Sequence, residues 1–205
     1  MLENFEFDSQ FRTKDGFLLC GVDEAGRGPF AGPVCAAAVI LPPDFELEGL
    51  NDSKKLTEKK REKLFPIICE NAVAYHIAFS SVDEIEEYNI LQATFLAMKR
   101  AIEGLGVVPD HILIDGDKLP PHLPSSAQPL IKGDALSASV AAASILAKVS
   151  RDRLMYELDR EYPQYGFAGH KGYGTKAHCD AILEYGILPC HRRSFLKKLL
   201  SRQEG

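Results

Sequence analysis

A pair of adjacent carboxylates directly after a buried strand constrains the fold of this chain more than any other feature of its sequence. The apolar residues 17–20 predict a short buried strand that runs into the stretch Gly21-Val22-Asp23-Glu24-Ala25-Gly26-Arg27-Gly28-Pro29. Neighbouring strand residues point to opposite faces, so Asp23 and Glu24 can share one ion only if the strand ends there and the chain bends. The glycines at 26 and 28 permit a bend, because glycine tolerates positive φ. The stretch suits a divalent metal beside a phosphate chain, although an acidic pair before a glycine turn is more often a solvated turn.

The composition places the chain among ordinary globular proteins. Of its 205 residues, 45% are hydrophobic and 26% are charged. No apolar run reaches the length that spans a membrane, and the acidic first residues lack the pattern of a signal peptide. Five cysteines without C-x-x-C spacing favour reduced thiols over a zinc site. We therefore expect a cytoplasmic protein without membrane association, built as one sizeable domain or as a domain with an appendage.

Basic residues are concentrated near the C-terminus. The whole chain carries a net charge of −5, which alone argues against nucleic-acid binding. The segment 170–202, however, carries seven Lys or Arg against two acidic residues. Such a basic segment on an acidic body suits a polyanion that touches one face. A solvated surface with a local excess of positive charge is an equal alternative.

The order of the predicted elements indicates an α/β fold. Two apolar runs, 17–23 and 33–41, are joined by a nine-residue turn and predict an antiparallel pair of strands. Strands and helices then alternate, with strands predicted at 72–80, 111–116 and 129–131, and helices at 82–104 and from 135 to about 161. Only helices follow. We therefore predict a central mixed β-sheet flanked by helices and a small C-terminal helical appendage, with residues 1–16 as a loosely attached arm.

Carboxylates recur at predicted strand ends or just before a helix, each time beside glycine: Asp23-Glu24, Asp115 and Asp134. Strand ends of an α/β sheet converge on one crevice, so we expect these side chains to meet. Carboxylates suit Mg²⁺ or Mn²⁺, and two such ions about 4 Å apart can stabilise both the attacking and the leaving oxygen of a phosphoryl displacement. Asp134 has an alternative role as a helix N-cap. For Asp152, inside a helix between two arginines, a structural salt bridge is favoured.

The chain resembles the type 2 ribonucleases H, and within them the bacterial ribonuclease HII family, from about residue 19 to residue 195. The resemblance rests on the stretch at 21–29 and on further motifs in order: Asp-Ser-Lys-Lys-Leu at 52–56, Ile-Asp-Gly at 114–116, Lys-Gly-Asp at 132–134, Ala-Ala-Ser-Ile-Leu-Ala-Lys-Val-Ser-Arg-Asp at 142–152, His-Lys-Gly-Tyr-Gly-Thr at 170–175 and His-Arg-Arg-Ser-Phe at 191–195. Any one motif is weak evidence, whereas all of them in order are very specific. The residues before 17 are too few for the extra N-terminal domain of the related ribonuclease HIII.

The resemblance implies an activity and a fold. The activity is that of a metal-dependent endonuclease that hydrolyses the RNA strand of RNA–DNA hybrids, including 5′ of single ribonucleotides embedded in duplex DNA. It leaves 3′-hydroxyl and 5′-phosphate ends and serves in ribonucleotide removal from DNA and in primer removal. The implied fold is ribonuclease H-like, with a catalytic domain at 17–161 between an N-terminal arm at 1–16 and a helical substrate-binding segment at 162–205.

The resemblance also assigns roles to individual residues. It makes Asp23, Glu24, Asp115 and Asp134 the catalytic residues and the ligands of Mn²⁺ or Mg²⁺. It makes Gly26-Arg27-Gly28 the reader of the ribose 2′-hydroxyl, the group that separates RNA from DNA, with Tyr173 in support. Candidate phosphate contacts, each of which can also be a plain surface residue, are Lys54, Lys171, Arg192 and Arg193.

Two other functions remain open at this level. One is a non-catalytic module that binds hybrids, which the four carboxylates near a polyanion disfavour. The other is a DNA-strand transferase or junction nuclease of the same broad fold, which the Gly-Arg-Gly turn disfavours. The expected partners are RNA–DNA hybrids and ribonucleotide-containing duplex DNA, bound by a monomer. Asp134 can be a direct or an outer-shell metal ligand.

Overall fold

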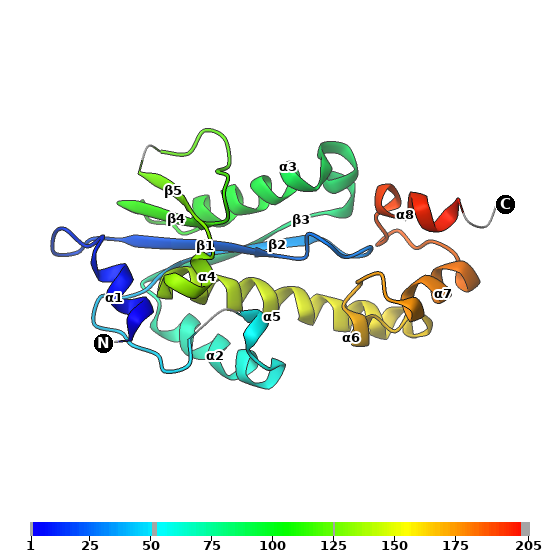
Figure 1. The fold of residues 1–205 in the computed structure, drawn as a ribbon, viewed down its shortest axis with the longest axis horizontal. Coiled ribbons are helices and arrows are strands. Elements are labelled where there is room, and N and C mark those ends of the chain that lie inside the picture. The colour runs from blue at the N-terminus through cyan, green and yellow to red at the C-terminus, as the bar shows by residue number, and fades with distance from the viewer. Residues whose placement is uncertain (1, 51–52, 125, 202–205) are drawn as a thin grey trace.

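The computed structural model describes residues 2–50, 53–124 and 126–201, which are organised around one five-stranded sheet (Figure 1). The strands are β1 Leu19–Ala25, β2 Val34–Ile40, β3 Ala74–Ser80, β4 His111–Asp115 and β5 Ala127–Leu130. Their order across the sheet is β3-β2-β1-β4-β5. Strand β2 is antiparallel to β1 and β3, whereas β4 is parallel to β1 and β5. The predicted mixed sheet and its antiparallel first pair are confirmed.

Helices cover both faces of this sheet, and the C-terminal helices lie beyond one end of it. They are α1 Glu3–Ser9, α2 Glu58–Asn71, α3 Val82–Glu103, α4 Gly133–Leu136, α5 Ala138–Glu161, α6 Phe167–His170, α7 Lys176–Tyr185 and α8 Arg193–Leu200. Helix α3 lies on one face, and α2 and α5 lie on the other (Figure 1). Every residue of β2 is buried, because its small and apolar side chains pack against helices on both sides.

Helix α5 packs very closely against the central strand β1. Its residues Ala138, Ala141 and Ala142 are fully buried, and such small side chains let the two backbones approach. A Cβ atom at Gly21 of β1 would lie 2.1 Å from the backbone carbonyl carbon of Ser139, so only glycine fits at this crossing. The predicted close packing of this small-residue helix behind the carboxylates is confirmed.

Two sequence predictions about this face of the sheet are wrong. Residues 3–9 are not a loosely attached arm but helix α1, which buries Phe5 and brings the Asp8 carboxylate to α5. Asp8 Oδ2 accepts hydrogen bonds from the amide and the hydroxyl of Ser139, at 2.8 and 2.7 Å. The helix expected from residue 135 is interrupted at Ser137, whose extended backbone starts a new helix and whose hydroxyl accepts from the amide of Val140.

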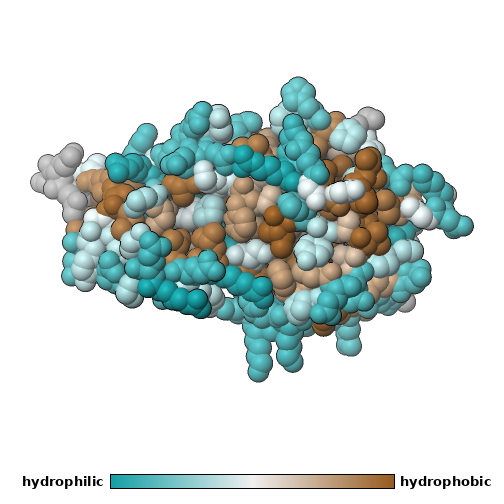
Figure 2. Space-filling view, turned by 180° about the vertical axis from the view of Figure 1, so that it is seen from behind, coloured by the Kyte–Doolittle hydropathy of each residue, from teal (hydrophilic) through white to brown (hydrophobic). Residues whose placement is uncertain are grey.

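The C-terminal helices form a separate layer at one end of the sheet, orange to red in Figure 1. Their apolar side chains, among them Phe167, Ile182 and Leu196, pack together with Met155 of α5. Glu86 of α3 accepts hydrogen bonds from the amide and hydroxyl at the start of α8, which fastens this layer to the main body. Figure 2 shows that hydrophilic side chains cover much of one face, with hydrophobic ones between them. Within the described ranges, no helix combines the length and apolar character needed to cross a membrane.

Candidate active site

Three carboxylates meet at the edge of the sheet where β1 and β4 end. Asp23 lies on β1, Asp115 is the last residue of β4, and Asp134 lies in α4. One carboxylate oxygen of each lies within 4.8 Å of those of the other two. Asp23 and Asp134 are buried and Asp115 is half-buried. The expected meeting is found for these three residues, because β1 and β4 run parallel and present their carboxyl ends at one edge.

Glu24 lies apart from this cluster because β1 does not end at the acidic pair. The strand continues to Ala25, so Asp23 and Glu24 point to opposite faces of the sheet. Asp23 faces Ser144 of α5, whereas Glu24 lines a cavity together with Asp115 and residues of α3. The Oε1 atom of Glu24 lies 3.5 Å from Nη1 of the arginine three residues on. The bend that the sequence suggested at the pair comes two residues later.

The segment that carries Asp134 is tied to β4. Asp115 Oδ1 accepts a hydrogen bond of 2.7 Å from the amide of Gly133. Asp134 follows in the first turn of α4, and Ser137, not Asp134, caps α5. The alternative N-cap role of Asp134 is therefore wrong, and its carboxylate is turned toward the other two acids.

Burial and like charge both oppose ionisation in this cluster. Burial raises the pKa of Asp23 well above its ordinary value, and the charges of Glu24 and Asp115 raise it further. Burial also raises the pKa of Glu24, against the lowering effect of the charge of Arg27. Lys54 brings a positive charge to the rim, with Nζ 3.9 Å from Oδ2 of Asp134. Acids crowded in this way favour a bound cation, which would relieve their repulsion.

Arg192, whose side chain is completely buried, binds the inner side of the turn after β1. Its guanidinium donates three hydrogen bonds to backbone carbonyls: Nη2 to Gly26 at 2.6 Å, Nη1 to Arg27 at 2.9 Å and Nε to Gly32 at 2.9 Å. Burial, with a contribution from the charge of Arg151, lowers the pKa of Arg192 to about 9. The arginine stays protonated at neutral pH and fastens the C-terminal layer to this turn.

A second buried arginine, Arg151 of α5, fixes the far side of the same turn. It donates to the carbonyls of Ala31 and Pro33, at 3.0 and 3.2 Å, and to that of Lys171 at 3.0 Å. The turn is thereby joined to the loop that carries Tyr173. Its neighbour Asp152 pairs with Lys148 at 2.7 Å and with an arginine of α2 at 3.7 Å, so the predicted structural salt bridge is confirmed.

The two glycines of the turn lie in opposite environments. Gly26 is buried with φ of +96°, and a Cβ atom there would lie 2.0 Å from Nε of Arg151. Gly28 is exposed and has no positive φ, and the nearest neighbour of a Cβ atom there would be Cε1 of Tyr173 at 3.6 Å. Tyr173 is itself 46% exposed. Packing and backbone conformation therefore demand glycine at position 26, whereas position 28 faces open space beside an aromatic ring.

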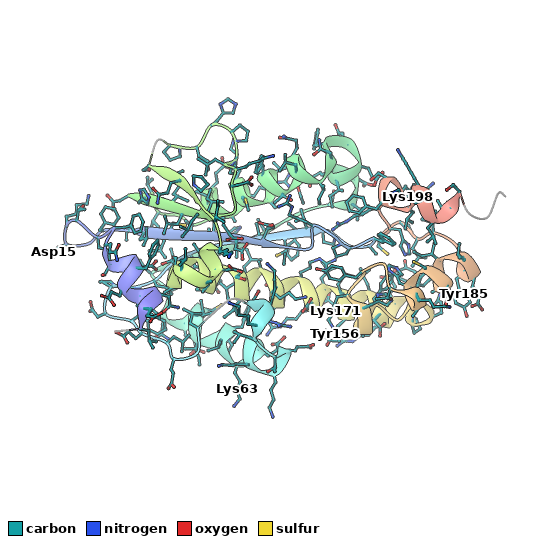
Figure 3. The ribbon with its side chains drawn as sticks, viewed as in Figure 1. Asp15, Lys63, Tyr156, Lys171, Tyr185 and Lys198 are labelled. Atoms are coloured by element: carbon teal, nitrogen blue, oxygen red, sulfur yellow. The ribbon has the colours of Figure 1, made fainter. Side chains whose placement is uncertain are left out.

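The four basic residues predicted to contact phosphate differ in how exposed they are. The prediction for Arg192 is wrong, because its guanidinium is buried and its hydrogen bonds go to backbone carbonyls. Lys171 is nearly buried, and its ammonium lies 3.8 Å from the centre of the Tyr156 ring (Figure 3). Arg193 is exposed, and so is the side chain of Lys54. For Lys54, Lys171 and Arg193, contact with phosphate stays a prediction.

Sequence reasoning missed a histidine network that supports the Tyr173 loop. The amide of Leu188 donates to Nδ1 of His191, which leaves a proton on Nε2 of His191 for the 3.0 Å bond to Nε2 of His178. His178 in turn donates from Nδ1 to the carbonyl of Tyr173 at 2.9 Å, and its ring stacks on that of His170. Burial lowers the pKa of His178 and of His191 to about 4, so both rings are neutral in the folded protein. Of the two rings that bond to each other, that of His178 lies in α7 and that of His191 lies between α7 and α8, and no motif in the sequence signals their pairing.

Comparison with known proteins decides the family. The family model described as Ribonuclease HII matches residues 20–198. The chain is 61% identical to the Ribonuclease HII of Desulfitobacterium hafniense over 88% of its own length and 70% of that relative. It is 55% identical to the Ribonuclease HII of Neisseria meningitidis serogroup A over 91% of its length and 97% of that relative. The chain belongs to the ribonuclease HII family.

Membership of the ribonuclease HII family makes this chain a ribonuclease H endonuclease. The solved structure of the ribonuclease H2 from Pyrococcus horikoshii OT3 is similar, with a TM-score of 0.75 at 28% identity. The match covers 92% of this chain and 99% of that one. The expected ribonuclease H-like fold is thus confirmed.

The acid cluster fits the divalent metal on which the ribonuclease H family depends. Oxygen ligands from Asp23, Asp115 and Asp134 converge closely enough for one ion, and hard cations such as Mg²⁺ and Mn²⁺ prefer such ligands. Burial raises the pKa of Asp23, the charges of Glu24 and Asp115 raise it further, and a bound cation would offset both effects. This chain therefore has the donor set that such an ion requires.

Proposed function

We propose that this chain hydrolyses the RNA strand of RNA–DNA hybrids and cuts 5′ of single ribonucleotides in duplex DNA, leaving 3′-hydroxyl and 5′-phosphate ends. One observation carries the proposal: Asp23, the member of the carboxylate cluster on β1, is followed five residues later by the exposed Gly28, which lies beside the exposed ring of Tyr173. A ribose and its own 5′-phosphate are neighbours in one nucleotide. A single nucleotide can therefore engage the acids and the turn together.

In this proposal Asp23, Glu24, Asp115 and Asp134 hold Mg²⁺ or Mn²⁺, with two ions in the substrate complex. Such ions supply an activated water and neutralise charge on the phosphate when bound. The carboxylates come from adjoining parallel strands and from a helix tied to one of them, so the sheet fixes their spacing. Glu24 lies on the other face of β1, next to Asp115, and we assign it to the rim of the metal site.

The chemistry at phosphorus follows from the ends produced. Water forms a new bond to phosphorus while the bond to the 3′-oxygen of the preceding nucleotide breaks, and that oxygen takes up a proton. The turn at 26–28 presents its backbone to the ribose 2′-hydroxyl, where glycine allows close approach. Tyr173 offers a ring face to the sugar or base. Lys54, Lys171 and Arg193 contact neighbouring phosphates.

We further propose that the chain acts as a monomer in the cytoplasm, on hybrids and on ribonucleotide-containing duplex DNA. Its cellular roles would be ribonucleotide removal and primer removal. The division into a catalytic domain at 17–161 and a substrate-binding segment at 162–205 agrees with the positions of the parts. The acids lie in the first, and Tyr173 and the basic face of α8 lie in the second.

The test compares three duplexes of one base sequence: all DNA, one strand entirely RNA, and one strand with a single ribonucleotide. Each is incubated with Mg²⁺, with Mn²⁺ or with a chelator. We expect cleavage of the two ribonucleotide-containing duplexes with either metal, no cleavage with chelator, and a single cut 5′ of the lone ribonucleotide. Cleavage of the all-DNA duplex, or products with 3′-phosphate ends, would contradict the proposal.

A further inference from the structure

We propose that Arg192 is a positioning residue for ribose recognition, because it orients two peptide groups of the turn so that their amides face the substrate. The inference rests on the proposed function, since it concerns how the 26–28 turn reads a 2′-hydroxyl. It replaces the phosphate contact expected from the sequence with a role inside the protein.

The positive charge of Arg192 lies inside the protein. Arg192 forms no ion pair within the part of the chain that the structure describes, although its guanidinium is fully buried. A buried cation without an acid is costly unless its donors are satisfied. Here backbone carbonyls of Gly26, Arg27 and Gly32 satisfy them. The fork of the guanidinium therefore dictates where these carbonyls point.

The trans peptide bonds of the turn fix the direction in which its amides point. The peptide bonds of the turn are trans, so the N–H of each residue points opposite to the carbonyl of the residue before it. The carbonyl of Gly26 points inward to Arg192, so the N–H of Arg27 points outward. The carbonyl of Arg27 also points inward, so the N–H of Gly28 points outward as well. One side chain thus orients two donors.

The amides of Arg27 and Gly28 are available to a ligand. Arg27 and Gly28 are exposed, and neither amide has an acceptor among the described residues. The ring of Tyr173 lies beside Gly28. Two fixed, outward N–H groups next to an aromatic ring can take a hydroxyl oxygen and the sugar that carries it, and a deoxyribose offers no such oxygen.

Arginine is needed for this role because of its shape. A planar guanidinium presents donors in a rigid fork, whereas an ammonium is a compact charge with rotatable donors. Lysine at position 192 would keep the charge but could not hold the carbonyls of Gly26, Arg27 and Gly32 in fixed directions. Arg151 holds the other side of the turn, at Ala31 and Pro33, and does not set the two amides.

The experiment measures binding preference rather than activity. An all-DNA duplex and the same duplex with one ribonucleotide carry different fluorophores and compete for the protein without metal. The ratio of the two affinities does not depend on how much protein is folded. We expect Arg192→Lys to reduce the wild-type preference for the ribonucleotide duplex about tenfold, roughly the value of one or two oriented hydrogen bonds. Its affinity for the all-DNA duplex should change little.

Arg193→Lys is the matched control, because the same change is made at the adjacent, exposed arginine. It should alter both affinities by the same small factor and keep the ratio. Arg192→Gln is the second variant if Arg192→Lys fails to fold, and it should also lose the preference. A folded variant at 192 that keeps the wild-type ratio would overturn the inference. A wild-type protein without any preference would instead overturn the reading of the 2′-hydroxyl by the turn.

Discussion

The acid cluster and the turn that follows Asp23 differ in how their charges are balanced. In the cluster, burial raises the pKa of Asp23, and repulsion from neighbouring carboxylates raises it further. In the turn, the donors of the buried Arg151 and Arg192 are satisfied by backbone carbonyls. The cluster is thus incomplete without an added cation, whereas the inner side of the turn is complete within the protein.

This difference predicts whether a substitution lowers activity first or stability first. Removing a charge from the cluster relieves repulsion, so the fold should tolerate it while activity is lost. A substitution on the inner side of the turn breaks hydrogen bonds between the buried arginines and backbone carbonyls, so stability should fall first. The outer side of the turn, at Gly28 and Tyr173, has open space and should behave like the cluster.

The largest effect is expected from Asp115→Asn, which should abolish cleavage and leave the fold intact. The amide oxygen can still accept the hydrogen bond from Gly133, but the charge that attracts a cation is gone. In thermal melts without metal, the variant should be at least as stable as the wild type. Adding Mg²⁺ or Mn²⁺ should raise the melting temperature of the wild type and not that of the variant.

The control for this prediction lies at the other end of the same strand. Asp110 precedes β4 and accepts a hydrogen bond from the amide of Leu18, away from the cluster. Asp110→Asn should cost some stability but keep the cleavage rate per folded molecule. Wild-type cleavage by Asp115→Asn would remove this residue from the metal site. Asp134→Asn should resemble Asp115→Asn, since Asp134 caps no helix.

The second largest effect is a contrast between the two glycines. Gly28→Ala adds a methyl group on the open side and should lower cleavage at a single ribonucleotide about a hundredfold, the scale of a misplacement of about 1 Å. Its melting temperature should match the wild type, because position 28 needs no positive φ. Gly26→Ala should instead destabilise the fold by on the order of 2 kcal/mol, through its positive φ and its contact with Arg151.

Cleavage rate and melting temperature are measured on the same preparations of both variants. If Gly28→Ala is folded and cuts the single-ribonucleotide substrate normally, the outer side of the turn has no part in recognition. If Gly26→Ala keeps the wild-type melting temperature, the packing of Arg151 beneath the turn is looser than the structure shows.

The sequence predicted the sheet and the meeting of Asp23, Asp115 and Asp134, because strand ends and adjoining glycines are local signals. It could not place Glu24, because the sequence does not show where the strand ends. Since β1 continues through Ala25, Glu24 points to the face opposite to Asp23. It also misjudged Arg192, because a basic residue near a predicted polyanion site is typical of a surface that binds phosphate. The burial of Arg192 depends on hydrogen bonds to residues 160 and more positions earlier in the chain.

A smaller effect is expected at the exposed lysines of α8, Lys197 and Lys198, the second of which is labelled in Figure 3. Their joint replacement by Ala should weaken binding to a hybrid and to plain duplex DNA by the same factor, since phosphate contacts carry no sugar information. The slope of log affinity against log salt should fall by roughly 0.9 for each phosphate that the variant no longer neutralises. An unchanged slope would mean that α8 does not touch the substrate, and a changed ribonucleotide preference would contradict its assignment to phosphate.

The smallest effect is that of pH on stability, which has opposite signs for the histidine network and for the acid cluster. His178 and His191 have pKa values of about 4 in the folded protein, below the ordinary 6.5, so the unfolded chain binds more protons between these values. Their contribution to stability is therefore lost as pH falls from about 6.5 toward 4. Asp23 has a raised pKa, so its protonation favours the folded state as pH falls. Titration of the imidazole signals by NMR separates the two effects, and both rings should stay neutral at pH 5.5. Rings that titrate near 6.5 would show that the histidine network does not hold the Tyr173 loop in solution.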